Sequence, residues 1–214
     1  ATTSIISITP TSGNVGTLVN LKANITSPNG PYEIKLDQTL IKSGTATGND
    51  VNVTFNIPEA SQGNHNITIF DIQKTENAST TFTINPSYLL KTNAPTLPAQ
   101  LQEGDSVTIN ATIIGGTQTT PYPASISVTN PNNATYTVSV NVTTSEIGTG
   151  TAYLTYPDQF TNASTNLTGT YKVSYNEASI STTFFVGLTK LAEYHRTQVV
   201  DVKAVYPPLE NVTS

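Results

Sequence analysis

Short runs in which apolar and polar residues alternate recur along the whole chain. One run places Val19, Leu21 and Ala23 at every second position, and the same spacing returns at 51–57 and 107–113. Successive side chains of a strand point to opposite faces, so a period of two indicates antiparallel strands with one buried face. Clusters of Gly, Pro, Asn and Ser separate the runs and are typical of turns. We therefore expect an all-β fold.

The alternating pattern is itself repeated. Three copies of one apolar triplet begin 88 and then 93 residues apart, at Val19-Leu21-Ala23, Val107-Ile109-Ala111 and Val200-Val202-Ala204. The segment Ser-Thr-Thr-Phe also occurs twice, ending at Phe82 and at Phe184. A sandwich of the immunoglobulin type takes about 100 residues. The repeat therefore predicts tandem immunoglobulin-like antiparallel β-sandwiches.

The repeat divides the chain into three segments. We expect one sandwich over 1–85, a second over 86–186, and in 187–214 a linker followed by the start of a third sandwich or a donor strand. A strand without its sheet cannot pair its backbone groups or bury its apolar face. The last segment is therefore either a truncated domain or a strand for a neighbouring molecule. In the second case the candidate assembly residues are Thr197, Val199, Val200, Val202, Ala204 and Tyr206.

Composition excludes several classes of function. The 214 residues include no Cys, which removes disulfides, thiolate nucleophiles and zinc–thiolate sites. A net charge of −5, with nine Lys and Arg and no basic run, argues against binding of nucleic acid or of anionic membranes. No apolar run approaches the roughly 18 residues that span a bilayer, so we expect no membrane insertion by this segment.

Candidate catalytic residues are few. The two histidines are His65, which shares the inward phase of Ile67 and is expected in the core or at its edge, and His195, in an expected linker. The chain has no Gly-x-Ser-x-Gly elbow, phosphate-binding loop or His-x-x-x-His pair. We therefore expect a protein that is not an enzyme and that needs no cofactor.

Two pairs of polar residues could contribute to a calcium site. They are Glu103 with Asp105, and Asn49 with Asp50. Carboxylate and amide oxygens suit calcium, but residues of this kind more often hydrogen-bond the backbone of their own turn. We favour the turns and expect no metal.

Ten Asn-x-Ser/Thr sequons are present, against roughly six expected by chance from this composition. Five of the asparagines fall between the apolar residues of expected strands, where side chains point outward. N-linked glycans are therefore expected at several of these positions: Asn24, Asn52, Asn66, Asn77, Asn110, Asn133, Asn141, Asn162, Asn166 and Asn211.

The segment ISITPTSGNVGTLVNLKANI, with Pro10, Ser12, Gly13 and Gly16, resembles the opening of IPT/TIG-type immunoglobulin-like domains. The segments EGDSVTINATI, ASISVTNPNNATY and TAYLTYP of the second repeat look like macroglobulin or Big-type sandwiches. Together, the cysteine-free and sequon-rich tandem repeats resemble archaeal cell-surface glycoproteins, notably the stalk protein of Sulfolobus-type S-layers and the subunits of archaeal thread filaments.

The resemblance implies an extracellular structural glycoprotein, either a surface-filament subunit or an S-layer stalk. Its partner would be another copy of itself, in a homopolymer, or an S-layer protein. Assembly would run head to tail, through domain ends or through strand complementation by the C-terminal strand or the strand at 4–9. Two alternatives stay open: an adhesin or ligand-binding module, and accessory sandwiches of a larger secreted protein.

Overall fold

A computed structural model describes residues 2–205. The candidate assembly residue Tyr206 and the sequon at Asn211 lie outside the described residues. Residues 2–205 contain no helical segment with the length and hydrophobicity that crossing a lipid bilayer requires.

The chain divides into two compact units. The boundary on the main path of the chain falls between Ser87 and Tyr88, and two later stretches also belong to unit 1. Unit 1 is Ala1–Ser87, Ile113–Thr120 and Thr143–Gly150, and unit 2 is Tyr88–Thr112, Pro121–Val142 and Thr151–Ser214.

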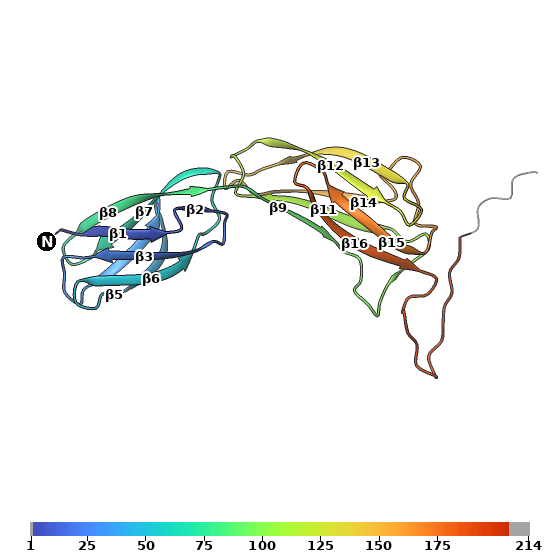
Figure 1. Ribbon diagram of the computed structural model, residues 1–214, viewed down its shortest axis with the longest axis horizontal. Coiled ribbons are helices and arrows are strands. Elements are labelled where there is room, and N and C mark those ends of the chain that lie inside the picture. Colours follow the sequence, from blue (N-terminus) through green and yellow to red (C-terminus); the bar gives the residue numbers. More distant parts are fainter. Residues whose placement is uncertain (1, 206–214) are drawn as a thin grey trace, which may run out of the picture. The chain divides into compact units, whose positions relative to one another are not determined.

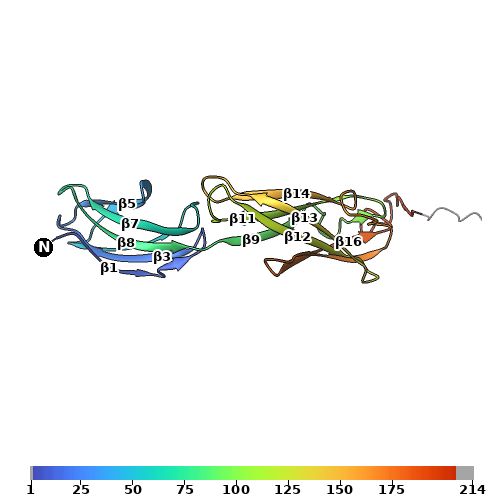
Figure 2. The ribbon, with the colours of Figure 1, turned by 90° about the horizontal axis from the view of Figure 1, so that it is seen from above.

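Unit 1 contains two sheets that pack as a sandwich (Figure 1). One sheet has the order β1-β3-β6 and the other β2-β8-β7-β4-β5. Figure 2 shows the two layers, with β1 and β3 in one and β5 and β7 in the other. The strands are β1 (Ser4–Thr9), β2 (Ser12–Gly13), β3 (Leu18–Asn24), β4 (Pro31–Leu36), β5 (Thr39–Thr45), β6 (Asp50–Asn56), β7 (Gly63–Asp71) and β8 (Glu76–Ile84).

The next eight strands repeat this topology in the second sandwich. Its sheets have the orders β14-β11-β9 and β10-β16-β15-β12-β13, so each strand corresponds to the one eight places earlier. The expected tandem immunoglobulin-like β-sandwiches are confirmed. The strands are β9 (Ser87–Thr92), β10 (Leu101–Gln102), β11 (Val107–Ile114), β12 (Pro121–Thr129), β13 (Thr135–Thr143), β14 (Gly150–Tyr156), β15 (Gly169–Tyr175) and β16 (Ile180–Gly187).

Two copies of the repeated triplet form the centres of the two cores. The triplet beginning at Val19 lies on β3, and that beginning at Val107 lies on β11; every member is at most 1% exposed. The alternation of buried and partly exposed residues along β11 is complete. The inward phase predicted for these strands is therefore confirmed, and its cause is the burial of every second side chain against the facing sheet.

The third copy of the triplet does not form a core in this chain. Val200 is 49% exposed and Val202 is 59% exposed, and neither lies in one of the strands of either sheet. The physical reason is that residues 188–205 have no second sheet to pack against, so alternation alone cannot bury their apolar side chains.

The register of the short parallel strands gives residue equivalences between the units. Gly13 on β2 pairs with Ile84, and Leu101 on β10 pairs with Val186. Gly13 and Leu101 are therefore equivalent and lie 88 residues apart in the sequence, as do Gly16 and Gly104. Both of these glycines have positive φ, 85° and 79°, a conformation that other residues rarely adopt. The two units therefore turn from β2 or β10 into the following strand in the same way.

Aromatic side chains fill much of the second core. Tyr171 on β15 stacks on Phe184 of β16 with ring centroids 5.0 Å apart, and Tyr156 packs edge-on against Tyr171 at 5.9 Å. The Tyr156 hydroxyl donates to the carbonyl of Ser164, and that of Tyr171 to the carbonyl of Leu167, each at 3.0 Å. The rings supply apolar area while their hydroxyls tie the β14–β15 connection to the sheet.

Candidate modification and assembly surfaces

Strand sequons combine an outward asparagine with a core residue. In Asn66-Ile67-Thr68 on β7, Ile67 is fully buried while Asn66 is exposed. The sequons that begin at Asn52 on β6 and at Asn141 on β13 follow the same pattern, with an exposed asparagine before a more buried valine. The middle residue fixes the strand to the core, so its neighbours on both sides are held toward solvent.

Exposure divides the nine described sequons into two groups. Two asparagines, Asn24 and Asn110, are half-buried. The side-chain Nδ2 of Asn24 donates to the carbonyl oxygen of Ala23 at 3.1 Å and to Asp50 Oδ1 at 2.9 Å. Asn110 Oδ1 is buried and has no hydrogen-bond partner among residues 2–205. The exposed asparagines are Asn52, Asn66, Asn77, Asn133, Asn141, Asn162 and Asn166.

Two of the exposed sequons lie in tight turns. Asn133, between β12 and β13, has φ of 63°, and Asn162, between β14 and β15, has φ of 60°. Asparagine tolerates this left-handed conformation better than most residues. Both side chains therefore project from turns where neighbouring strands do not crowd them.

His65, expected in the core or at its edge, is bonded on both sides of its ring. Its Nδ1 lies 2.7 Å from Asp37 Oδ2, and its Nε2 lies 2.8 Å from the carbonyl oxygen of Ser61. Both ring nitrogens of His65 are therefore engaged by neighbouring oxygens. Its position at the edge of the core agrees with the sequence-based interpretation. The ring joins the β4–β5 turn to the loop before β7.

Hydrogen bonds and charge lower the pKa of Asp37. Burial raises this pKa, but the hydrogen bond from His65, the backbone N–H of Asn66 at 2.9 Å and the charge of His65 outweigh it. The other histidine, His195, is exposed, and its backbone N–H donates to Gln198 Oε1 at 2.7 Å.

The carboxylates of Glu103 and Asp105 hold the C-terminal segment. Asp105 accepts the backbone N–H of Gln102 at 2.8 Å through Oδ2 and the ammonium of Lys203 at 2.9 Å through Oδ1. Glu103 is buried and accepts the backbone N–H of Val205 at 3.0 Å. Three of the four carboxylate oxygens of this pair therefore accept hydrogen bonds from the protein itself. Among residues 2–205 no group of three or more His, Cys, Asp or Glu could hold a metal ion.

The second polar pair, Asn49 with Asp50, also makes hydrogen bonds near the turn in which it lies. Asn49 Nδ2 donates to the carbonyl of Ile25 at 2.8 Å and to that of Thr26 at 3.2 Å, which links the β5–β6 turn to the end of β3. With Asp50 Oδ1 within reach of the Asn24 amide, both members of the pair bond within unit 1.

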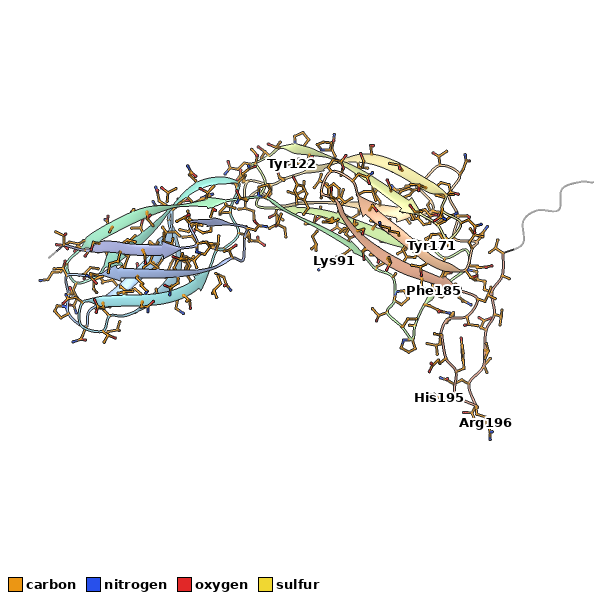
Figure 3. All side chains as sticks on the ribbon, viewed as in Figure 1. Lys91, Tyr122, Tyr171, Phe185, His195 and Arg196 are labelled. Carbon is orange, nitrogen blue, oxygen red and sulfur yellow. The ribbon has the colours of Figure 1, made fainter. Side chains whose placement is uncertain are left out.

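Residues 188–205 form an irregular hairpin attached to unit 2. Gln102 Nε2 donates to the carbonyls of Leu188 and Asp201, and Thr189 forms an isolated bridge with Val202. Figure 3 shows His195 and Arg196 at the tip of this hairpin. We call residues 188–205 the C-terminal hairpin.

Among residues 188–205 the candidate assembly residues lie in no strand of either sheet. All the described candidates are exposed, Val199 reaching 90%, and only Val202 makes a bridge. The described candidates are Thr197, Val199, Val200, Val202 and Ala204. The alternative donor, the strand at 4–9, is β1, which pairs with β3 of its own unit because their alternating faces match. Donation of either strand to another molecule stays a prediction.

A groove that the sequence did not indicate lies beside the end of β16. Its volume is about 500 Å³, and three of its lining residues expose much of their apolar side chains: Leu97 at 67%, Phe185 at 40% and Leu188 at 43%. The available signal was Phe185, an apolar residue in the outward phase of β16. We call this the β16 groove; its lining is Leu97, Gln100, Thr168, Phe185, Gly187, Leu188 and Ala192.

No protein-family model and no curated protein matches the sequence. Several solved structures are similar to the chain. Dimeric latent PorU from Porphyromonas gingivalis aligns with 90% of this chain and 20% of its own, at 13% identity and a TM-score of 0.36. An auxiliary nutrient binding protein from Bacteroides thetaiotaomicron VPI-5482 aligns with 90% of this chain and 60% of its own, at 12% identity and a TM-score of 0.32.

A third similar structure is the fibronectin(III)-like modules of CbhA from Clostridium thermocellum. It aligns with 92% of this chain and all of its own, at 16% identity and a TM-score of 0.25. The chain thus spans a fifth of the PorU chain and three fifths of the nutrient-binding chain. At these scores none of the three carries an argument about function, which we take from the geometry of the chain itself.

Proposed function

We propose that the chain is a non-enzymatic structural glycoprotein of the cell exterior, whose β-sandwiches carry N-linked glycans and act as building blocks of a surface assembly. The observation that carries this proposal is the placement of the sequons. Seven of the nine described sequon asparagines are exposed, on strands or in connections of both sandwiches. Glycans at these positions would give a surface building block solubility and steric cover.

The sequon geometry supports glycan attachment in physical terms. Attachment needs an accessible Asn Nδ2 and space for a bulky, hydrated group. The middle residue of each strand sequon packs inward, so a glycan on the asparagine leaves the core undisturbed. Charged residues make up only 11% of the chain, so glycans would add hydration to a surface with few charges.

Mass spectrometry of the protein isolated from the surface of its own cells tests this proposal. We expect glycopeptides at several of the seven exposed sequons and recovery in the surface fraction. Protein made in a host without N-glycosylation is the control and should give unmodified masses. Unmodified peptides at all seven positions, or recovery inside the cell, would contradict the proposal.

The resemblance to archaeal surface glycoproteins extends the proposal to a subunit of a surface filament or the stalk of an S-layer. Electron microscopy of isolated cell surfaces separates these possibilities. Threads labelled by an antibody against this chain support a filament, and label confined beneath a two-dimensional lattice supports a stalk. Label on neither structure would remove both.

The β16 groove favours one second candidate, an adhesin or ligand-binding module. An open groove with apolar lining is a typical site for small ligands. Binding of a glycan or peptide array probe by the native chain, and its loss in Leu188→Asp, would support this role. If no probe binds above background, the ligand-binding role is contradicted and only the structural role remains.

A further inference from the structure

The β16 groove occupies the place in unit 2 that is equivalent to a covered place in unit 1. Strands β7 and β15 begin at Gly63 and Gly169, so Gln62 corresponds to Thr168. Asn85 follows Ile84 as Gly187 follows Val186, and both of the preceding residues pair with the equivalent short strand. Thr168 and Gly187 line the groove.

In unit 1 this place is covered by the stretch Ile113–Thr120, which is part of that unit. The backbone N–H of Gln62 donates to the carbonyl of Gly116 at 2.8 Å. A Cβ atom added to Gly115 would lie 3.2 Å from Ile84 Cγ2 and 3.4 Å from the carbonyl oxygen of Asn85. The β11–β12 connection therefore packs on the end of this sandwich closely enough to leave little space.

In unit 2 the equivalent residues face an open groove. Leu97, Phe185 and Leu188 contribute exposed apolar surface there, which is costly to leave in water. Exposed apolar side chains gathered in this way are typical of a protein–protein contact.

We propose that the β16 groove binds the β3–β4 connection, residues 25–30, of a second copy of this chain. This connection is the counterpart of 113–118, which covers the equivalent place in unit 1, because strands β3 and β11 are 88 residues apart in register. It offers an exposed Pro28, and the nearby β7–β8 turn offers Ile72, 43% exposed, whose N–H donates to the carbonyl of Pro31.

The distribution of charge favours a second copy as the occupant. The C-terminal hairpin beside the groove carries Lys190, Arg196 and Lys203, three of the nine Lys and Arg of the chain, against two acidic residues. The 187 residues before it carry six Lys and Arg against eleven Asp and Glu. The hairpin thus has a net charge of +1 and residues 1–187 a net charge of −5, with Lys203 already paired to Asp105. This difference in sign weakly favours contact between the hairpin of one molecule and the body of another, and added salt should weaken the contact.

Such a contact joins two different surfaces, one on unit 1 and one on unit 2, so it propagates into chains of molecules. The inference rests on the proposed function, because it supplies the contact by which the surface assembly would grow. It differs from strand complementation, since no strand leaves its own sheet.

Sedimentation velocity of the full chain, made without glycosylation, tests the contact. We expect wild-type protein to form a series of species that grows with concentration up to about 1 mM, the weak end of the range for specific contacts. Leu188→Asp, in the groove, and Ile72→Asp, on the opposite surface, should each weaken association about tenfold or more. Tyr153→Asp, at a residue that is 67% exposed on β14, is the matched control and should associate like wild type.

Mixing the two variants distinguishes this contact from a symmetric one. Each variant keeps one intact surface, so an equimolar mixture should form a 1:1 dimer and nothing larger. Circular dichroism verifies that each variant is folded. Monomeric wild type, wild-type association in either variant, or no dimer in the mixture would overturn the inference.

The outcome is separable from that of the proposed function. Glycans at the exposed sequons together with a monomeric chain would remove the contact and leave the surface glycoprotein. Association without glycans would remove the glycoprotein and leave the contact.

Discussion

His65 Nε2 lies 2.8 Å from the carbonyl oxygen of Ser61, four residues earlier in the chain. At the equivalent place in unit 2, the hydroxyl of Tyr171 donates to the carbonyl of Leu167, also four residues earlier, at 3.0 Å. The second arrangement is the tyrosine corner of immunoglobulin-like sandwiches, which ties the preceding loop to its sheet. In unit 1 the imidazole of His65 makes the equivalent link between loop and sheet, and its other nitrogen, Nδ1, is hydrogen-bonded to Asp37.

The histidine corner predicts a pH-dependent contribution to the stability of unit 1. The pKa of Asp37 is lowered in the folded state, so its contribution is present above the ordinary value of 3.8 and is lost as the pH falls through the folded pKa. Because the Asp37 side chain is 49% exposed, Asp37→Asn should lower the free energy of unfolding at pH 7 by only about 0.5 kcal/mol. Urea unfolding at pH 7 and at pH 2 measures the difference, which should be smaller at pH 2. An equal loss at both values would refute the role of the charge.

A pair of tyrosines in the second core predicts opposite effects of one chemical change. The Tyr175 hydroxyl is buried without a partner among residues 2–205, and burial raises the pKa of Tyr175 to about 12. Tyr175→Phe should therefore raise the free energy of unfolding by about 1 kcal/mol, because it removes an unsatisfied polar group. Tyr171→Phe removes the hydrogen bond to Leu167 and should lower the free energy of unfolding by about 1 kcal/mol. Denaturant unfolding of both variants checks the signs; a loss in Tyr175→Phe would contradict this account.

The exposure of the sequons predicts their order of glycan occupancy. Asn133 and Asn162 project from turns and should be the most fully modified. Asn110 is half-buried on the central strand β11, with its Oδ1 enclosed, and should stay unmodified. Site-specific occupancy from glycopeptide mapping after secretion from a glycosylating host gives the comparison. A fully occupied Asn110 would show that its side chain turns outward.

The buried carboxylate of Asp71 predicts a structural role without a metal. It accepts the backbone N–H and the hydroxyl of Ser27, each at 2.8 Å, and the N–H groups of Gln73 and Lys74. Burial raises its pKa, but these hydrogen bonds outweigh it and hold the pKa below 3.8. Asp71→Ala leaves several donors unsatisfied and should lower the free energy of unfolding by about 2 kcal/mol. We expect the wild-type protein to have the same stability with and without a calcium chelator. A lower stability in the presence of the chelator would contradict the metal-free role.

The bonds to Glu103 and Asp105 predict that the C-terminal hairpin can be loosened selectively. Lys203→Ala removes the ion pair with Asp105, so amide exchange in 188–205 should rise about fivefold, the equivalent of about 1 kcal/mol, while exchange in β15 stays unchanged. Asp201→Asn is the matched control, since the contact of Asp201 with Gln102 uses its backbone carbonyl. Hydrogen–deuterium exchange measured by mass spectrometry resolves the segment. Unchanged exchange in Lys203→Ala would show that the backbone bonds alone hold the hairpin.

The sequence by itself determined the strands, their inward faces and the two-fold repetition of the fold. Val19 and Val107 begin runs of alternating residues, and alternation has a unique physical solution when one face of a sheet must be buried. The outward placement of Asn66 and Asn141 followed from the same phase. Local pattern was sufficient because the period of a strand is a property of neighbouring residues.

Only the tertiary structure decided what the irregular segments do. The alternation of Val200 and Val202 is as regular as that of Val19 and Leu21, yet it forms no strand of a sheet, because a strand needs a partner that alternation does not supply. The bond from Lys203 to Asp105 and the exposure of Leu188 beside Thr168 depend on residues far apart in sequence. Such contacts arise from the packing of whole sheets, so a local sequence pattern does not predict them.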